Sequence, residues 1–147
     1  MNEKIDKLLN ELTDLIKQNE GCKLTAYPDP ATGGGPWTIG YGYARGVKAG
    51  DMITQAHALE LLTQNALETL DIAVRLSPIL TQAGNEKKWV AVADFIYNVG
   101  ESAYESSTFK KKVDAADWNA AIVECKKWCH GHDGNGKVIE LPGLLKR

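Results

Sequence analysis

The 147-residue chain has few of the features that mark several large classes of protein. Its 17 Lys and Arg nearly balance its 19 Asp and Glu, so no strong field of one sign favours nucleic acid as a partner. No run of 18 apolar residues offers a membrane span, and the first residues lack the apolar segment of a secretory signal. Three cysteines are a poor basis for a disulfide framework, which indicates a reducing cytoplasm.

Hydrophobic periodicity predicts helices over most of the chain. The first covers about residues 3–20 and has Asn2 as its N-cap. The second starts after Thr54 and ends near Ser77, because Pro78 disfavours a helical residue before it. These two helices flank a segment of different character.

Three further helices are predicted after this pair, with another helical turn or two through Phe109 and Val113 before the last of them. One runs from near Asn85 to Gly100, and the capping-box pattern of Ser102 and Glu105 predicts a short helix that Ser102 caps. Asp117 predicts the N-cap of the last clear helix. The apolar face of this last helix comprises Trp118, Ala121, Ile122, Cys125, Trp128 and Cys129.

The segment over about residues 22–52 is rich in glycine and proline. Its β-branched and aromatic residues near 24–27 and 37–41 predict a small hairpin or meander. We therefore expect one α+β, mainly helical domain over residues 1–147. A small β lobe is joined to a larger helical lobe at about 54–147, with a cleft between them as a common place for a site.

Glu20 and Asp29 are the first candidates for chemistry. Glu20 stands at the C-terminal end of the first predicted helix, where the helix dipole destabilises a carboxylate and favours its acid form. Asp29 lies between Pro28 and Pro30, which predicts a stiff loop. The alternatives are a solvated last-turn residue and an ordinary turn residue.

The third candidate, Thr38, lies in a predicted strand in which two of the next four residues are glycine. Alternation places Thr38, Gly40 and Gly42 on one face, where glycine suits close approach of a ligand to the backbone. A bulge or bend explains these glycines equally well. A helix-end Glu, a loop Asp and a strand Thr together fit glycoside hydrolysis by two carboxyl groups.

Two segments make the sequence resemble a known family. Residues 20–29 (EGCKLTAYPD) and 37–42 (WTIGYG) closely resemble the phage-type lysozymes, the T4-like endolysins. The resemblance continues in order through residues 50–56, 94–100, 107–109 and 141–147. It implies a lysozyme-like fold and hydrolysis of the β-1,4 bond between N-acetylmuramic acid and N-acetylglucosamine in bacterial peptidoglycan, for host-cell lysis.

The resemblance also implies roles for individual residues. Glu20 matches the general acid, Asp29 the carboxylate that aligns the attacking water, and Thr38 the hydroxyl that helps to hold this water. Tyr41, Gly42 and Asn98 match positions near the substrate. The list of departures from the family pattern is short: a longer loop from Asp29 to Thr38, in which Thr32 offers an alternative hydroxyl, and Tyr43 in place of the usual His.

The partners implied are glycan strands of peptidoglycan, with no nucleic acid, no membrane insertion, no cofactor and no metal. A monomer in the host cytoplasm is expected, released to the wall or periplasm through a holin. A lytic transglycosylase and an inactive peptidoglycan-binding protein are the alternatives.

A zinc site at Cys125, Cys129, His130 and His132 fits no common ligand spacing, and the two cysteines fall on an apolar face.

Overall fold

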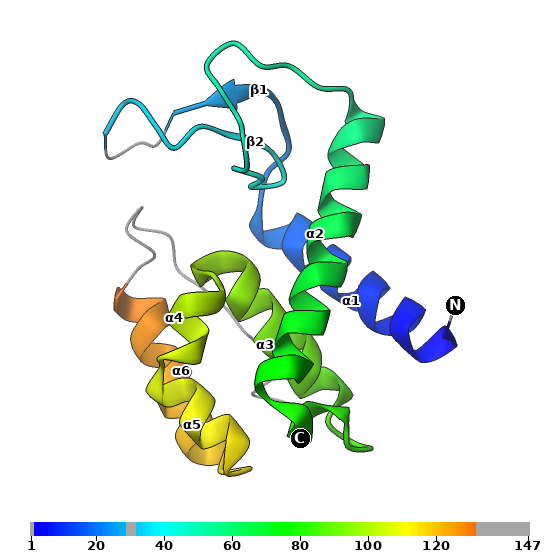
Figure 1. Ribbon diagram of the computed structural model, residues 1–147, viewed down its shortest axis with the longest axis vertical. Helices are drawn as coiled ribbons and strands as arrows, with labels where there is room; N and C mark the ends of the chain where they lie inside the picture. Colours follow the sequence, from blue (N-terminus) through cyan, green and yellow to red (C-terminus); the bar gives the residue numbers. More distant parts are fainter. Residues whose placement is uncertain (1, 29–31, 132–147) are drawn as a thin grey trace.

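The computed structural model describes residues 2–28 and 32–131 (Figure 1). The chain is mainly helical with a two-stranded antiparallel sheet, as predicted. Its elements, in order, are α1 (Glu3–Asn19), β1 (Lys23–Tyr27), β2 (Thr38–Gly40), α2 (Gln55–Leu76), the 3₁₀ helix η1 (Pro78–Thr81), α3 (Glu86–Val99), α4 (Glu101–Glu105), α5 (Thr108–Asp114) and α6 (Trp118–Gly131).

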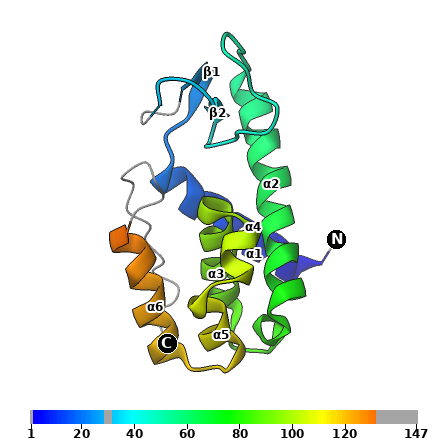
Figure 2. The ribbon, with the colours of Figure 1, turned by 60° about the vertical axis from the view of Figure 1, so that its left-hand side comes forward.

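The arrangement separates the sheet from most of the helices. Figures 1 and 2 show β1 and β2 at one end of the molecule and α3 to α6 at the other. Helix α2 runs along the length between these ends, and α1 crosses beside α2 and α3. We call the described residues 22–28 and 32–52 the β lobe.

The first two predicted helices have the boundaries that their caps impose. The Asn2 side chain accepts a hydrogen bond of 2.8 Å from the Lys4 N–H at the start of α1. Thr54 caps α2 in the same way, accepting from the His57 N–H at 3.1 Å. Helix α2 ends before Ser77, as predicted from the proline that follows.

The structure corrects the predicted capping box. Helix α4 begins at Glu101, so Ser102 lies inside it and caps nothing. Gly100 ends α3 with φ +94, a conformation that favours glycine, and the chain turns directly into α4. The hydroxyl cap belongs instead to Ser107, which accepts from the Lys110 N–H at 3.0 Å and begins α5.

Helix α6 begins as predicted. The Asp117 carboxylate accepts from the Ala120 N–H at 3.2 Å, which satisfies one of the free donors in the first turn. Cys125 is buried in the hydrophobic core, as its place on the apolar face indicates. The side chain of Cys129 and the turn dipeptides after residue 131 lie outside the described residues.

The sheet is a short, irregular hairpin. Tyr27 pairs with Thr38 and Lys23 with Gly40, so five residues of β1 face three of β2 and the register shifts between the pairs. The chain before α2 adds a partial third strand, because the Ile53 N–H donates to the Leu24 carbonyl at 2.9 Å. The predicted small hairpin or meander is therefore confirmed, as a two-stranded hairpin with an isolated bridge between Thr25 and Met52.

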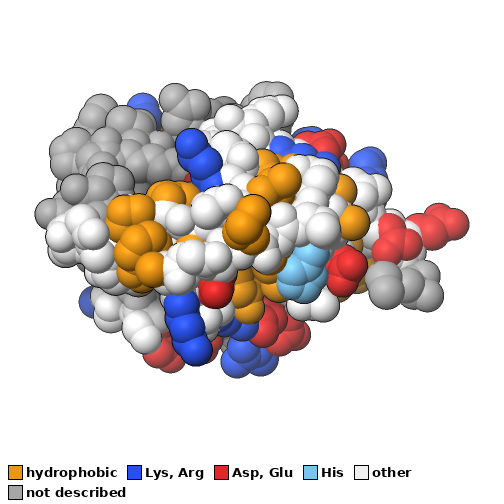
Figure 3. Space-filling view, turned by 90° about the horizontal axis from the view of Figure 1, so that it is seen from above, with side chains coloured by type: hydrophobic (Ala, Val, Ile, Leu, Met, Phe, Trp, Pro, Cys, Tyr) orange, Lys and Arg blue, Asp and Glu red, His pale blue; other side chains and the backbone are white. Residues whose placement is uncertain are grey.

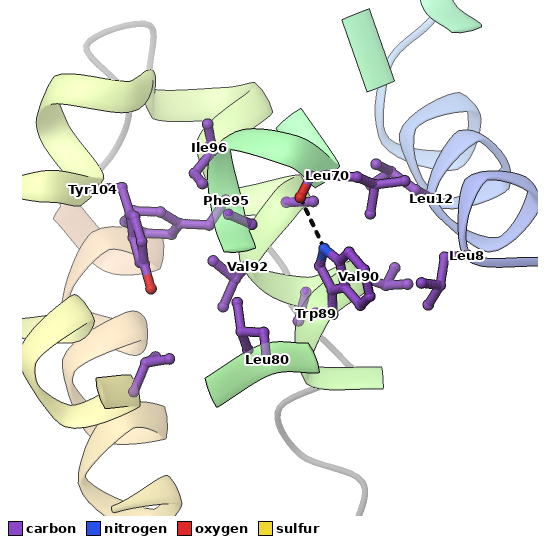
Figure 4. Close-up of a cluster of buried hydrophobic side chains, with 14 of the residues drawn as sticks. Leu8, Leu12, Leu70, Leu80, Trp89, Val90, Val92, Phe95, Ile96 and Tyr104 are labelled. Carbon is purple, nitrogen blue, oxygen red and sulfur yellow. Dashed lines mark hydrogen bonds between the residues drawn. The ribbon is translucent and has the colours of Figure 1, made fainter. Parts of the chain in front are cut away.

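Buried hydrophobic side chains from several helices form the core (Figure 4), and aromatic rings pack against one another within its helical part. The Phe95 ring lies 4.8 Å from that of Phe109 and 5.2 Å from that of Trp128, measured between centroids. Tyr104 packs edge-on against Phe95. The Trp89 indole N–H donates to the Leu70 carbonyl at 2.9 Å, which satisfies a polar group inside this core. Full burial of a phenylalanine side chain, as at Phe95 and Phe109, contributes roughly 1.5–3 kcal/mol.

The surface at the sheet end has no continuous apolar face in the view of Figure 3. Hydrophobic side chains there form separate groups among polar atoms. Over the described residues, no helix is both long enough and apolar enough to cross a membrane.

Candidate active site

Glu20 stands where α1 stops. Its backbone is extended, with φ −107 and ψ 129, while its N–H still donates to the Ile16 carbonyl at 2.7 Å. The residue is half-buried. The predicted place of Glu20 at the helix end is thus confirmed, and the rigid helix fixes the start of its side chain.

Gly42 leaves the space that the Glu20 carboxylate occupies. A Cβ atom on residue 42 would lie 3.3 Å from Cδ and Oε2 of Glu20 and 3.5 Å from Oε1. The two distances of 3.3 Å are tighter than ordinary nonbonded contacts, whereas the 3.5 Å distance is ordinary. Residue 42 also has φ +83. Glycine suits residue 42 because the backbone has a positive φ there and because a Cβ atom would crowd the Glu20 carboxyl group.

The prediction that Thr38, Gly40 and Gly42 share one face of a strand is wrong. Strand β2 ends at Gly40, and two hydrogen bonds of 2.8 and 2.9 Å between Ile39 and Tyr43 close a turn over the residues between them. Gly40 has φ +65 and packs on Ala58 of α2, whereas Gly42 packs on Glu20. The positive φ values break the alternation of side-chain directions on which the prediction depended.

Thr38 is the half-buried first residue of β2 and lies opposite Tyr27 in the sheet. Asp29, two residues after Tyr27 in the sequence, lies outside the described residues. The alternative hydroxyl, Thr32, is exposed and serves its own turn. It donates to the Gly35 carbonyl and accepts from the Gly34 N–H, both at 3.2 Å.

Two tyrosines lie in the electrostatic environment of Glu20. Burial, and then the negative charge of Glu20, raise the pKa of Tyr27. The same two causes, in the same order, strongly raise the pKa of Tyr97 on α3. Both phenols therefore stay neutral and able to donate hydrogen bonds beside this carboxylate.

Tyr97 was not among the sequence candidates. Its hydroxyl donates to the backbone carbonyl of Tyr41 at 2.5 Å, and so joins α3 to the turn that contains Gly42. The Gln55 side chain donates to the Tyr41 hydroxyl at 2.9 Å. The sequence signal for Tyr97 is a phenol near the apolar stripe of a helix, where a buried hydroxyl needs a partner.

Asn98 is half-buried next to Tyr97 in the chain. Its amide donates to the Asp94 carbonyl of its own helix at 2.8 Å. This bond shows how the side chain is held, and contact of Asn98 with substrate stays a prediction.

Within residues 2–28 and 32–131 we find no group of three His, Cys, Asp or Glu side chains that could hold a metal ion. His132 and the side chains of Cys129 and His130 lie outside the described part of the chain.

Known proteins match this chain over most of its length. It is 36% identical to an endolysin of Acyrthosiphon pisum secondary endosymbiont phage 1, over 90% of this chain and 86% of that protein. It is 31% identical to the endolysin of Salmonella phage P22, over 77% of each chain. It also matches 48% of the length of the Bacillus phage B103 endolysin, at 34% identity.

Solved structures share the fold. An endolysin from Escherichia coli O157:H7 phage FAHEc1 superposes with a TM-score of 0.66 at 28% identity, covering 91% of this chain and 83% of that one. The muramidase domain of SpmX from Asticaccaulis excentricus gives a TM-score of 0.70 at 24% identity, over 92% of this chain and 87% of that one, a likeness of fold. The model of the phage lysozyme family, described as "Phage lysozyme", matches residues 17–147. The chain therefore belongs to the phage lysozyme family.

Proposed function

We propose that the protein is an endolysin that hydrolyses the β-1,4 bond between N-acetylmuramic acid and N-acetylglucosamine in bacterial peptidoglycan. The main support is the position of the Glu20 carboxyl group, at the end of α1 and beside Gly42, in a chain of the phage lysozyme family. The comparison proteins named endolysin and muramidase support this assignment. The glycan strand lies between the β lobe and the helices in this proposal.

The proposed chemistry needs one acid and one positioned water. Glu20 donates its proton to the glycosidic oxygen, while water attacks the anomeric carbon of the muramic acid residue. Asp29 and Thr38 align this water. The half-buried place of Thr38 at the start of β2 supports its part, because a side chain on a paired strand is held more firmly than one on a loop.

The substrate contacts proposed beside these residues are Tyr41, Gly42 and Asn98. Gly42 presents backbone where a side chain would collide with Glu20. The Tyr41 hydroxyl accepts a hydrogen bond from Gln55 and the Asn98 amide donates one to the Asp94 carbonyl, which restricts both side chains before substrate arrives. No cofactor or metal takes part in this proposal.

The test compares the wild-type protein with Glu20→Gln on purified peptidoglycan. We expect Glu20→Gln to lower the rate of fragment release by about 10²–10⁴-fold, the usual contribution of a general acid. Glu3→Gln is the matched control, because it makes the same change about 25 Å away at the other end of α1. Full activity of Glu20→Gln would contradict the proposal.

The fragments themselves separate the alternatives. Reducing muramic ends support hydrolysis, and 1,6-anhydro ends would assign the protein to the lytic transglycosylases. Binding to peptidoglycan without any fragment release would make it an inactive wall-binding protein.

We also propose that the enzyme acts as a monomer and that a holin releases it from the host cytoplasm to the wall. Sedimentation of the purified protein tests the first part. Culture lysis with and without a co-expressed holin tests the second, and lysis that does not depend on the holin would contradict it.

A further inference from the structure

Tyr97 connects the helical part of the molecule to the turn beside Glu20. The donor hydroxyl and the Tyr41 carbonyl that accepts it are 56 residues apart in the sequence and 2.5 Å apart in space. The bond is partly buried, so water competes with it less than at the surface. It therefore fixes the backbone of residue 41 relative to α3.

A second hydrogen bond holds Tyr41 from the other side. The Gln55 amide, in the first turn of α2, donates to the Tyr41 hydroxyl at 2.9 Å. The thiol of Cys22, two residues after Glu20, donates to the Gln55 side-chain oxygen Oε1 at 3.5 Å. Tyr41 is thus held through both its carbonyl and its ring, by two different helices.

The residue after Tyr41 lies beside Glu20: a Cβ atom on residue 42 would be 3.3 Å from two atoms of the Glu20 carboxyl group. Gly42 has no side-chain freedom, so its position follows from the peptide group that joins it to Tyr41. A shift of this peptide group therefore moves Gly42 relative to the Glu20 carboxylate.

We propose that Tyr97 is a positioning residue for Glu20, acting through its hydrogen bond to the Tyr41 carbonyl and the contact of Gly42 with the carboxylate. This inference rests on the proposed function, in which Glu20 is the general acid. Tyr97 fixes the backbone of residues 41 and 42, which lies beside the Glu20 carboxyl group. It makes no contact with substrate in this proposal.

Tyr97→Phe tests the proposal, because it removes only the hydroxyl. We expect kcat on peptidoglycan to fall about tenfold or more while KM changes less than twofold, since small misplacements of catalytic groups cost large factors in rate. We also expect the amide resonance of Gly42 to shift in the NMR spectrum. A purely structural role would change neither kcat nor this resonance beyond what the control shows.

Tyr104→Phe is the matched control. Tyr104, on α4, is fully buried, and its hydroxyl shares a hydrogen bond of 2.7 Å with the Ser77 hydroxyl. Both variants should lower Tm by a few degrees, because each loses the hydrogen bonding of one phenol hydroxyl. Only Tyr97→Phe should lower kcat.

Equal kcat values for Tyr97→Phe and Tyr104→Phe would overturn the inference. If Tyr97→Phe does not fold, 3-fluorotyrosine at residue 97 changes the donor strength of the same hydroxyl while keeping the ring, and an unchanged kcat together with an unmoved Gly42 resonance would overturn the inference. A wild-type protein that releases no fragments would refute the proposed function instead. An unmoved Gly42 resonance in Tyr97→Phe would then still refute the positioning role.

Discussion

Replacement of Gly42 by alanine tests whether the contact with Glu20 matters for activity. Alanine at φ +83 costs about 1–2 kcal/mol, since a Cβ is disfavoured in left-handed backbone. For a chain of this size, this corresponds to a fall in Tm of roughly 2–8 °C. This part of the effect concerns stability alone.

The second part of the effect concerns the carboxylate. The new Cβ would lie 3.3 Å from Cδ and Oε2 of Glu20, so the carboxylate must move by roughly 0.3–0.5 Å to restore ordinary contact. Because a misplacement of 1 Å can cost about 10²-fold in rate, we expect Gly42→Ala to lower kcat about tenfold.

Gly46→Ala separates the two parts. Residue 46 has φ +66, so alanine suffers similar backbone strain there, but nothing lies within 4 Å of the added Cβ. Both variants are compared by thermal unfolding and by the initial rate of peptidoglycan solubilisation. We expect similar losses of Tm and a loss of rate in Gly42→Ala only. If Gly42→Ala is as active as Gly46→Ala, the close contact has no catalytic consequence and our reasoning fails.

Two further predictions concern stability. Phe109→Ala should lower the free energy of unfolding by about 3–5 kcal/mol, because the ring is fully buried against Phe95; a loss below about 1 kcal/mol in urea unfolding would contradict this packing. Arg45→Ala should cost less than about 1 kcal/mol at pH 7, since Arg45 and Glu68 are both largely exposed. The Arg45 hydrogen bond lowers the pKa of Glu68 below its ordinary 4.5, so this contribution is present above that pH and is lost as the pH falls below it. Urea unfolding of wild type and Arg45→Ala at pH 7 and at pH 3 checks this, and a difference that persists at pH 3 would contradict it.

The helices could be predicted from the sequence because their determinants are local. Asn2, Thr54 and Asp117 each satisfy donors within three residues, so the pattern of residues sufficed to place the helix starts. The capping box at Ser102 misled because Gly100 ends α3 and begins α4 without a hydroxyl cap. The short 3₁₀ helix after Ser77 was missed, since four residues carry too little periodicity.

The candidate site was predicted only in part. The place of Glu20 at the helix end follows from periodicity and the glycine after it. The role of Gly42 depends on a positive φ and on a contact 22 positions away, neither of which a strand pattern reports. The sequence signals that the Tyr97 hydroxyl needs a partner, but it does not identify that partner, because a backbone carbonyl is present in every residue.

The most direct test of the proposed function is digestion of peptidoglycan in water enriched in heavy oxygen, with mass spectrometry of the fragments. Hydrolysis places the oxygen of the attacking water on the anomeric carbon of the new muramic end. We predict heavy oxygen at the reducing muramic ends released by the wild-type protein, and loss of these fragments in Glu20→Gln. Unlabelled 1,6-anhydro ends from the wild-type protein would contradict the assignment of this chain as a hydrolase.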